Sequence, residues 1–311
     1  VCELLYPLVS GCTVYFLGRT PTPAILLKAM SEIHPYLVVT VPLVIEKIYK
    51  KNISPVVNAR KIRAFWHVPV VGDIIKKVLL NKLIKTFGGK LRYFLCGGAA
   101  IDKDVERCLL DAHFPLDVGY GMTECGPLIG GEVISGFHAR SGGKPVPGME
   151  VRIAEPNKYG VGEIQVRGEN VFQGYYKNEE ATKAAFTRDG WFKTGDLGKM
   201  DKKKNIFVKG RLKTMILDET GQNIYPEDIE SQLNAEQAVS ESLVVSREGK
   251  LVALIFPDQA DQQLNRPRNW DEWLQRINQR LPRYSQLHHV EVVDTEFEKT
   301  PKRSIKRFLY H

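Results

Sequence analysis

The sequence predicts an α/β protein in three parts: a parallel sheet covered by helices, a small antiparallel β-barrel, and an α+β domain. Up to about residue 130, apolar strand-like runs alternate with segments of helical apolar spacing. Short alternating runs broken by glycine and proline follow to about residue 210, after which helix and strand signals mix again. Strands that alternate with helices favour a parallel sheet. We therefore expect domains at 1–130, 131–210 and 211–311.

The first part is expected to contain four strands separated by helices. "DKDVERCLLDAHF" begins with Asp102, a residue type that commonly caps helices. In open parallel sheets, ligands collect at the carboxyl ends of the strands. "CGGAA" and "GYGMTE" both follow strands, so both are candidate ligand loops. The strands are expected at 12–18, 36–42, 91–98 and 116–121, and the helices at 23–34, 43–52 and 102–114.

The second and third parts show different sequence patterns from the first. "GGKPVPGMEVRIAE" and "GEIQVRGENVFQGYY" are short alternating runs, as expected for a small barrel or sandwich. In the third part, "YPEDIESQLNA" predicts a helix with Pro226 in its first turn. A hairpin is expected at 239–258 with its turn at Gly249, then a helix at 269–282 and a strand at 287–294.

Bulk composition narrows the classes of function. The net charge of +8, from 44 basic and 36 acidic residues, suits anionic ligands, although a solvated basic surface is the simpler explanation. No nucleic-acid-binding module is recognisable, so we expect no nucleic-acid partner. No apolar run is long enough to span a bilayer. The odd number of cysteines without metal-ligand spacing predicts free thiols in a reducing cytosol: Cys2, Cys12, Cys96, Cys108 and Cys125.

The turn "LDVGYGMTECG" carries the most chemical information. Tyr120 can offer a flat face to a base, Thr123 a hydrogen bond to a phosphate, and Glu124 a ligand to Mg²⁺. Glycine at position 121 allows the backbone to approach a ligand closely. Three further motifs follow in order: "FKTGDLG", "KGRLKTMI" and "GQNIYPEDIE". Because Asp196 and Arg211 flank one short hairpin, we expect them to lie at the same end of the barrel.

This ordered set resembles the adenylate-forming superfamily of acyl-CoA synthetases, adenylation domains and luciferases. The segment "ILDETGQNIYPEDIE" is most similar to the long-chain fatty-acid CoA ligase branch. The resemblance implies an AMP-forming acid–thiol ligase that uses ATP, Mg²⁺ and CoA. Such an enzyme converts ATP and a fatty acid to acyl-AMP and pyrophosphate, then acyl-AMP and CoA to acyl-CoA and AMP.

The resemblance also assigns roles to residues around the nucleotide. The loop and tyrosine that sandwich adenine correspond to Gly97, Gly98, Ala99, Tyr120 and Gly121. Glu124 corresponds to the magnesium ligand and Thr123 to a phosphate contact. Asp196 corresponds to the acceptor of the ribose hydroxyls, with Arg211 on the same ribose or the phosphate. Taken alone, each of these has an ordinary structural explanation, such as a turn aspartate or a surface arginine.

The remaining assignments lie in the C-terminal part. The resemblance makes this domain mobile, with Lys213 as its hinge, and places Gly221 in a loop that lines the pantetheine tunnel. An adenylation lysine is expected near "TPKRSIK", but Ser304 stands where the family has that lysine. Lys302 and Lys306 flank the position, and a solvated basic tail is the competing interpretation.

The sequence also lacks a motif that the family's reaction requires. The glycine- and serine/threonine-rich phosphate loop, which ends in lysine, is missing. The chain starts within an apolar segment without a basic leader, so we expect it to be the back portion of a longer enzyme, with a partial first domain and little activity alone. Another acyl- or aryl-adenylating enzyme and a non-catalytic AMP-binding module are the alternatives. We expect a cytoplasmic protein. Peripheral contact with a membrane is also expected to be possible, because a fatty-acid substrate partitions into lipid.

Overall fold

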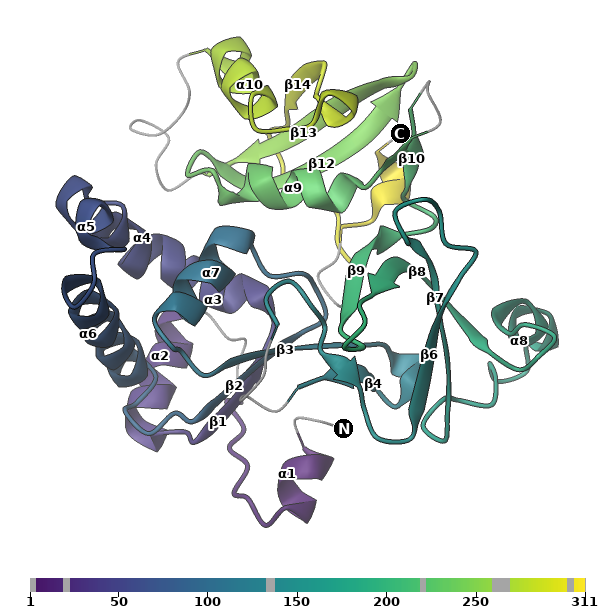
Figure 1. Ribbon diagram of the computed structural model, residues 1–311, viewed down its shortest axis with the longest axis horizontal. Coiled ribbons are helices and arrows are strands. Elements are labelled where there is room, and N and C mark those ends of the chain that lie inside the picture. Colours follow the sequence, from purple (N-terminus) through teal and green to yellow (C-terminus); the bar gives the residue numbers. More distant parts are fainter. Residues whose placement is uncertain are drawn as a thin grey trace. The chain divides into compact units, whose positions relative to one another are not determined.

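A computed structural model of the chain describes residues 4–18, 23–132, 138–218, 222–258, 269–300 and 305–310, without the side chains of Pro23 and Lys61. It divides into two compact units (Figure 1). The first comprises Val1–Thr194 and Gly198–Val208, and the second comprises Gly195–Leu197 and Lys209–His311. The predicted α/β class is confirmed, whereas the three domain boundaries and the hinge at Lys213 stay predictions.

The first unit is built on a five-stranded sheet of order β1-β2-β3-β4-β5. Its strands are β1 (Leu37–Thr40), β2 (Tyr93–Gly97), β3 (Leu116–Gly121), β4 (Leu128–Gly131) and β5 (Lys144–Pro145). β1, β2 and β3 are parallel, as the alternation of strands and helices predicts. β4 and β5 continue the sheet in antiparallel pairing.

Helices accompany this sheet in the first unit. They are α1 (Leu5–Val9), α2 (Pro23–Ile33), α3 (Pro42–Ile48), α4 (Ser54–Val57), α5 (Arg60–Phe65), α6 (Val71–Thr86) and α7 (Lys103–Asp111). Helices α2, α3 and α7 lie where helical spacing was predicted, whereas α1, α4, α5 and α6 were not predicted. The Asp102 carboxylate accepts from the backbone N–H groups of Asp104 and Val105, so it caps α7 as expected. The predicted helix at 43–52 passes from α3 into a π-helical turn, η1 (Tyr49–Ile53).

One expected strand is wrong. The β-branched and aromatic run at 12–18 forms neither helix nor strand, and most of its side chains are exposed. A strand needs a neighbouring backbone to pair with, and β propensity alone does not supply one. Among the described residues the sheet ends at β1, so this run has no paired strand.

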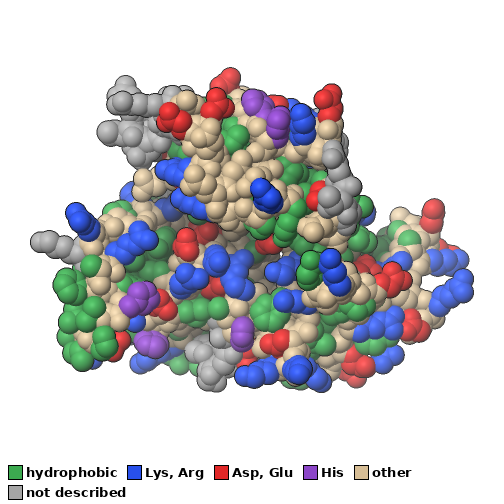
Figure 2. Space-filling view, turned by 45° about the horizontal axis from the view of Figure 1, so that its top comes forward, with side chains coloured by type: hydrophobic (Ala, Val, Ile, Leu, Met, Phe, Trp, Pro, Cys, Tyr) green, Lys and Arg blue, Asp and Glu red, His purple; other side chains and the backbone are tan. Residues whose placement is uncertain are grey.

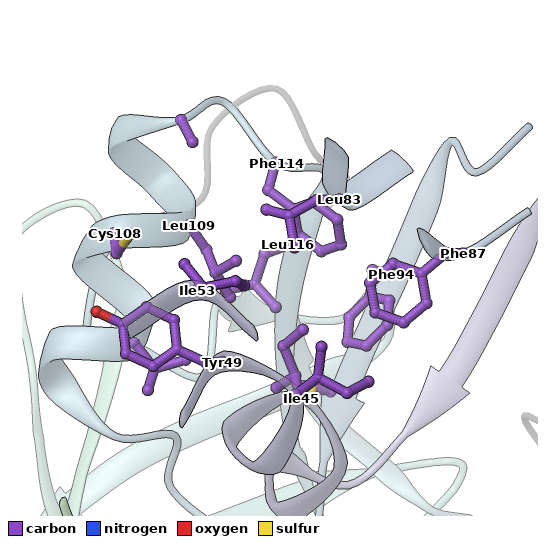
Figure 3. Close-up of a cluster of buried hydrophobic side chains, with 14 of the residues drawn as sticks. Ile45, Tyr49, Ile53, Leu83, Phe87, Phe94, Cys108, Leu109, Phe114 and Leu116 are labelled. Carbon is purple, nitrogen blue, oxygen red and sulfur yellow. The ribbon is translucent and has the colours of Figure 1, made fainter. Parts of the chain in front are cut away.

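The core of the first unit lies where the sheet meets α3, α6 and α7. Figure 3 shows Phe94 and Leu116 from the strands packed with Ile45, Leu83 and Leu109 from the helices. The rings of Phe87, Phe94 and Phe114 lie within 5.8 Å of one another, centroid to centroid. This packing holds the carboxyl ends of β2 and β3 in position, which is where the candidate ligand loops begin.

The expected second region forms a four-stranded sheet of order β6-β7-β8-β9. Its strands are β6 (Met149–Ala154), β7 (Gly162–Gly168), β8 (Phe192–Met200) and β9 (Ile206–Arg211), and α8 (Glu179–Ala185) lies between β7 and β8 in sequence. β6 and β7 are antiparallel. Asn178 caps α8 through a hydrogen bond from the backbone N–H of Ala181. Closure of this sheet into a barrel stays a prediction.

The second unit contains a three-stranded sheet, β12 (Val239–Arg247), β13 (Lys250–Pro257) and β14 (His289–Val292). β12 and β13 form the predicted hairpin around a two-residue turn, in which Glu248 and Gly249 have φ of 51° and 76°. Positive φ at both positions is the pattern of a type I′ turn. The unit also contains β10 (Ile216–Leu217), β11 (Asn223–Ile224), α9 (Pro226–Ala235) and α10 (Trp270–Asn278).

Both faces of this sheet are buried, with a side-chain period of two. On β13, Leu251, Ala253 and Ile255 pack in the cluster that contains the apolar side chains of α9 and α10. The alternate residues Val252, Leu254 and Phe256 pack with Phe297 on the other side. This explains the continuous apolar run "LVALIF", which a strand exposed on one face would not show.

Two general findings follow from the described residues. None of their helices is both long and apolar enough to cross a bilayer. Cys12, Cys96, Cys108 and Cys125 form no disulfide. Burial raises the pKa of the Cys96 thiol to about 12, with the nearby Glu46 carboxylate as a second cause.

Candidate functional site

The loop Gly97–Ala99 begins at the carboxyl end of β2. Gly98 has φ of +85° and is exposed, so the loop turns away from the sheet at a conformation that favours glycine. Gly97 pairs in register with Gly119 of β3, and a Cβ on Gly97 would lie 3.5 Å from the Gly119 carbonyl oxygen. The two predicted ligand loops therefore start from adjacent strand ends.

Tyr120 and Gly121 lie at the end of β3, where the register with β4 shifts. Tyr120 is only 9% exposed and packs in an apolar cluster with Ile129 and Met149. A Cβ on Gly121 would lie 2.0 Å from the Pro127 carbonyl oxygen, so backbone proximity within the protein requires glycine there. Contact of Tyr120 and Gly121 with a base stays a prediction.

Thr123 and Glu124 lie in a single 3₁₀ turn, η2 (Thr123–Cys125), which ends at Gly126 with φ of +62°. Thr123 is exposed and Glu124 is half-buried. Asn170 holds the turn in place: its side-chain amide donates to the carbonyl oxygens of Cys125 and Leu128 at 2.7 and 2.9 Å. Asn170 was not predicted from sequence, because its two contacts join positions 45 and 42 residues apart.

The Glu124 carboxylate has a protein partner that the sequence did not reveal. The Tyr175 hydroxyl donates to Glu124 Oε1 at 3.2 Å, and the Phe172 backbone N–H donates to the Glu124 carbonyl oxygen at 2.8 Å. Partial burial, followed by the negative charge of Glu124, raises the pKa of Tyr175. Tyr175 therefore remains a protonated donor at neutral pH. The glycine–tyrosine pair in "FQGYY" is the local feature that could have marked this segment.

Asp196 and Arg211 lie together, as their spacing predicts. Arg211 Nε is 3.1 Å from Asp196 Oδ1. The Asp196 side chain is 6% exposed and that of Arg211 is 60% exposed, so a buried carboxylate meets a solvent-facing guanidinium. The Leu212 backbone N–H donates to the Gly195 carbonyl oxygen at 2.8 Å, which keeps the two strand ends adjacent.

Lys213 follows within a turn and is exposed. The backbone N–H of Met215 donates to the Arg211 carbonyl oxygen at 3.1 Å, closing the turn. The Thr214 hydroxyl donates to Glu227 Oε1 at 2.7 Å, which ties the turn to the first turn of α9. The turn after Arg211 is therefore attached to α9 by a side-chain hydrogen bond.

The C-terminal candidates are only partly described. Gly221 and Lys302 lie outside the described residues. Lys306 pairs with Glu298, with Nζ 3.1 Å from Oε2. The neighbouring Arg307 contacts the Glu230 carboxylate of α9 and donates to the Val244 carbonyl oxygen at 3.4 Å. These contacts join the C-terminal segment to α9 and β12 within the second unit.

The donor set around Glu124 fits a magnesium ion that also binds phosphate oxygens. Mg²⁺ in such sites takes one or two carboxylates, with phosphates and water completing its octahedron. Within the described part of the chain, no three acidic, histidine or cysteine side chains gather into a cage that could hold a metal by themselves. A single carboxylate beside the Thr123 hydroxyl is compatible with the substrate-shared arrangement.

The structure places the predicted residues in two groups. Gly97, Tyr120 and Glu124 belong to the first unit, whereas Asp196 and Arg211 belong to the second. Of these residues, Asp196 and Arg211 are in direct contact. Convergence of both groups on one ligand stays a prediction.

Known families match both ends of the chain. Residues 1–176 match the family described as AMP-binding enzyme, and residues 213–310 match the AMP-binding enzyme C-terminal domain. The chain is 34% identical over 275 residues to the long-chain-fatty-acid–CoA ligase FadD15 of Mycobacterium tuberculosis, covering 81% of the chain and 43% of that protein. It is 27% identical over 289 residues to long-chain-fatty-acid–CoA ligase 1 of Saccharomyces cerevisiae, covering 84% and 41%. The chain thus spans about two-fifths of these relatives.

Solved structures share the fold. ATP-bound MatB from Rhodopseudomonas palustris matches 97% of this chain and 55% of its own, with a TM-score of 0.73 and 24% identity. The o-succinylbenzoate CoA synthetase MenE from Bacillus subtilis, in complex with its acyl-adenylate intermediate, matches 98% and 57%, with a TM-score of 0.74 and 24% identity. At this identity, the likeness is one of fold alone.

Proposed function

Because the chain belongs to the AMP-binding enzyme family, we propose that it is part of a long-chain fatty-acid CoA ligase of the AMP-forming type. Two half-reactions make up this activity. A fatty-acid carboxylate attacks the α-phosphorus of ATP and pyrophosphate leaves; the CoA thiol then attacks the acyl carbon and AMP leaves. The similarity to long-chain-fatty-acid–CoA ligases from a bacterium and a yeast supports the substrate class.

The contact between Asp196 and Arg211 is the observation that supports the proposal most. A carboxylate accepts two hydrogen bonds at once, so it suits the paired hydroxyls of a ribose. Arg211 contacts one oxygen of this carboxylate and orients it.

Thr123 and Glu124 are proposed to act at the phosphate. The exposed Thr123 hydroxyl would donate to an adenylate oxygen, and Glu124 would hold Mg²⁺. A bound Mg²⁺ supplies positive charge that offsets the negative charge of the phosphate oxygens. Tyr175 would orient the Glu124 carboxylate through its hydrogen bond. Adenine would lie between the loop Gly97–Ala99 and the end of β3, near Tyr120.

The lysine that assists adenylation is proposed to come from the C-terminal segment. Lys302 and Lys306 are the candidates, and an ammonium at either position would stabilise charge developing on the α-phosphate. Lys306 would first have to leave Glu298, to which it is paired. Such an exchange is compatible with rotation of the C-terminal domain about Lys213, and with Gly221 entering the pantetheine tunnel in the thioester-forming state.

Acid-dependent exchange of pyrophosphate into ATP tests the proposal, using an enzyme that contains this chain in full. The panel of acids should include palmitate, a medium-chain acid, malonate and an aryl acid. Exchange that is fastest with palmitate supports the proposal. Fastest exchange with an aryl or short acid would instead identify another acyl-adenylating enzyme. AMP binding without exchange for any acid would identify a non-catalytic AMP-binding module.

We further propose that the 311 residues alone have little adenylating activity, because their sequence contains no phosphate loop. Backbone N–H groups of such a loop hold the triphosphate. Turnover of palmitate with ATP and Mg²⁺ by the 311 residues, at a rate equal to that of the longer enzyme, would contradict this.

A further inference from the structure

Positive charge in this chain is concentrated in one segment of the first unit. Residues 50–90 contain ten of the 44 Lys and Arg residues and one of the 36 Asp and Glu residues. The rest of the chain is therefore almost neutral overall. A charge density this uneven points to an anionic surface as a partner. The nucleotide-site residues proposed above lie outside this segment, so the site does not account for the charge.

The same segment exposes a large apolar surface. Figure 2 shows hydrophobic side chains gathered at the left end of the molecule, over α5 and α6, with lysines and arginines beside them. We call this surface the α5–α6 tip. Its exposed apolar side chains are Phe65, Val68, Val70, Val71, Ile74 and Val78.

Helix α6 carries apolar side chains on both its inner and its outer face. Its inner face buries Leu79 and Leu83 in the core of the first unit. On its outer face, Ile74 and Val78 are 59% and 62% exposed and lie four residues apart, so they form one stripe. A helix that serves only to cover a sheet would carry polar residues on that outer face.

Basic side chains continue this stripe. Lys82 follows Val78 by four residues, and Lys85 follows it by seven, so both lie on the outer face, and both are exposed. Arg60 and Arg63 of α5 are also exposed. A short apolar tip with basic residues beside it matches the charge and polarity profile of an anionic lipid surface, whose headgroups are negative and whose acyl region is apolar.

The turn between α5 and α6 is held by specific contacts. Trp66 is 7% exposed, and its indole N–H donates to Asp111 Oδ2 of α7 at 3.1 Å. A Cβ on Gly72 would lie 2.4 Å from the Trp66 carbonyl oxygen, so the turn packs tightly. Val70 has φ of +66°, an unfavourable conformation for a β-branched residue, and is 69% exposed. The turn therefore presents an apolar residue to solvent at a conformational cost.

We propose that the α5–α6 tip is a docking surface for an anionic lipid bilayer. Phe65, Val70 and Ile74 enter the boundary between headgroups and acyl chains, while Lys82 and Lys85 contact the headgroups. This holds whatever acid the enzyme activates, and it depends on no residue of the proposed nucleotide site.

Co-sedimentation with vesicles tests this proposal, with phosphatidylcholine vesicles compared with mixed phosphatidylcholine–phosphatidylglycerol vesicles. The full chain should bind the mixed vesicles and bind pure phosphatidylcholine far more weakly. The double variant K82Q/K85Q should lose roughly twentyfold in affinity for mixed vesicles, because each basic residue near the surface strengthens binding about fivefold. The matched control K202Q/K203Q, which removes two exposed lysines elsewhere, should bind as the unchanged chain does.

The apolar contribution is tested separately with I74S/V78S. Both side chains are exposed, so thermal unfolding should stay within a few degrees of the unchanged chain, while vesicle affinity falls roughly tenfold or more. Equal binding to neutral and anionic vesicles would overturn the proposal. So would concentration-dependent dimers that I74S/V78S abolishes when no vesicles bind, since the tip would then be a self-association surface. Loss of vesicle binding in a longer form of the protein would show that further chain covers the tip, and would overturn it as well.

Discussion

The hydroxyl of Tyr175 donates a hydrogen bond to Glu124, a carboxylate 51 residues earlier in the chain, at 3.2 Å. This contact ties the "QGYY" segment to the turn that carries the proposed magnesium ligand. Burial and the negative charge of Glu124 raise the pKa of Tyr175, so the phenol keeps its proton at neutral pH. A group that orients a metal ligand affects metal affinity without touching the metal.

We predict that Tyr175→Phe weakens the binding of Mg²⁺ at Glu124 in the proposed enzyme. The Mg²⁺ concentration needed for half-maximal pyrophosphate exchange should rise about tenfold, because loss of such an orienting partner commonly costs that much in metal affinity. Tyr176→Phe is the matched control, since Tyr176 is adjacent and 88% exposed. Equal Mg²⁺ requirements for the two variants would argue against a role of Tyr175 at the metal.

Asp196→Asn should weaken AMP binding by about ten- to a hundredfold, because hydrogen bonds to a charged acceptor are the stronger kind. The proposed ribose contact adds a sharper readout. The unchanged protein should prefer AMP to 2′-deoxy-AMP in calorimetry, and Asp196→Asn should narrow that preference. Asp189→Asn removes an exposed Asp–Arg pair elsewhere and should leave both affinities unchanged. An undiminished preference in Asp196→Asn would exclude Asp196 as the ribose acceptor.

Gly121→Ala should destabilise the first unit by about 1–3 kcal/mol, the usual cost of forcing an atom into a packed site. Its Cβ would lie 2.0 Å from the Pro127 carbonyl oxygen, and backbone must move to admit it. Gly131→Ala is the control on the adjacent strand, because its nearest neighbour would be Leu128 at 3.8 Å. The readout is the free energy of unfolding in urea, and equal values for the two variants would show that the β3–β4 turn can relax.

Burial raises the pKa of Asp117 from 3.8 to about 6, with Glu132 as a nearby like charge. Its folded pKa exceeds its unfolded pKa, so its contribution to stability is fully present below pH 3.8 and is lost as pH rises through about 6. Asparagine carries no charge, so Asp117→Asn removes the destabilisation that ionisation of Asp117 causes. The free energy of unfolding of the variant, relative to that of the unchanged protein, should therefore be about 2 kcal/mol higher at pH 7.5 than at pH 4.5.

The exposed Asp73 supplies the control for this pH dependence. Asp73→Asn should change the free energy of unfolding little at either pH, because its side chain is 80% exposed. If the advantage of Asp117→Asn is the same at both pH values, the carboxyl of Asp117 does not titrate differently in the folded protein.

Local chemistry made much of the fold predictable. Asp102 caps α7 and Gly249 turns the β12–β13 hairpin because each acts on backbone groups within a few residues. Asp196 and Arg211 could be paired because one hairpin separates them. The strand expected at 12–18 failed because pairing depends on a partner backbone, which residue propensity does not reveal.

Contacts between distant segments were not predictable in this way. Asn170 and Tyr175 contact the turn at Glu124 from more than 40 residues away in the sequence. Neither residue belongs to a motif from which its partner could be predicted. The mostly buried Tyr120 illustrates the same limit. Its motif predicted an aromatic ring that is available to a ligand. The ring is mostly buried because it packs against β4 and β6, which follow it in the sequence.

The central claim is that Tyr120, Glu124, Asp196 and Arg211 surround one adenosine phosphate. A crystal structure of the protein with AMP and Mg²⁺ tests it most directly. The account predicts adenine beside the loop Gly97–Ala99, the ribose hydroxyls on Asp196, and the phosphate near Thr123 and Glu124. AMP bound elsewhere, with Asp196 and Glu124 both out of its reach, would contradict the account.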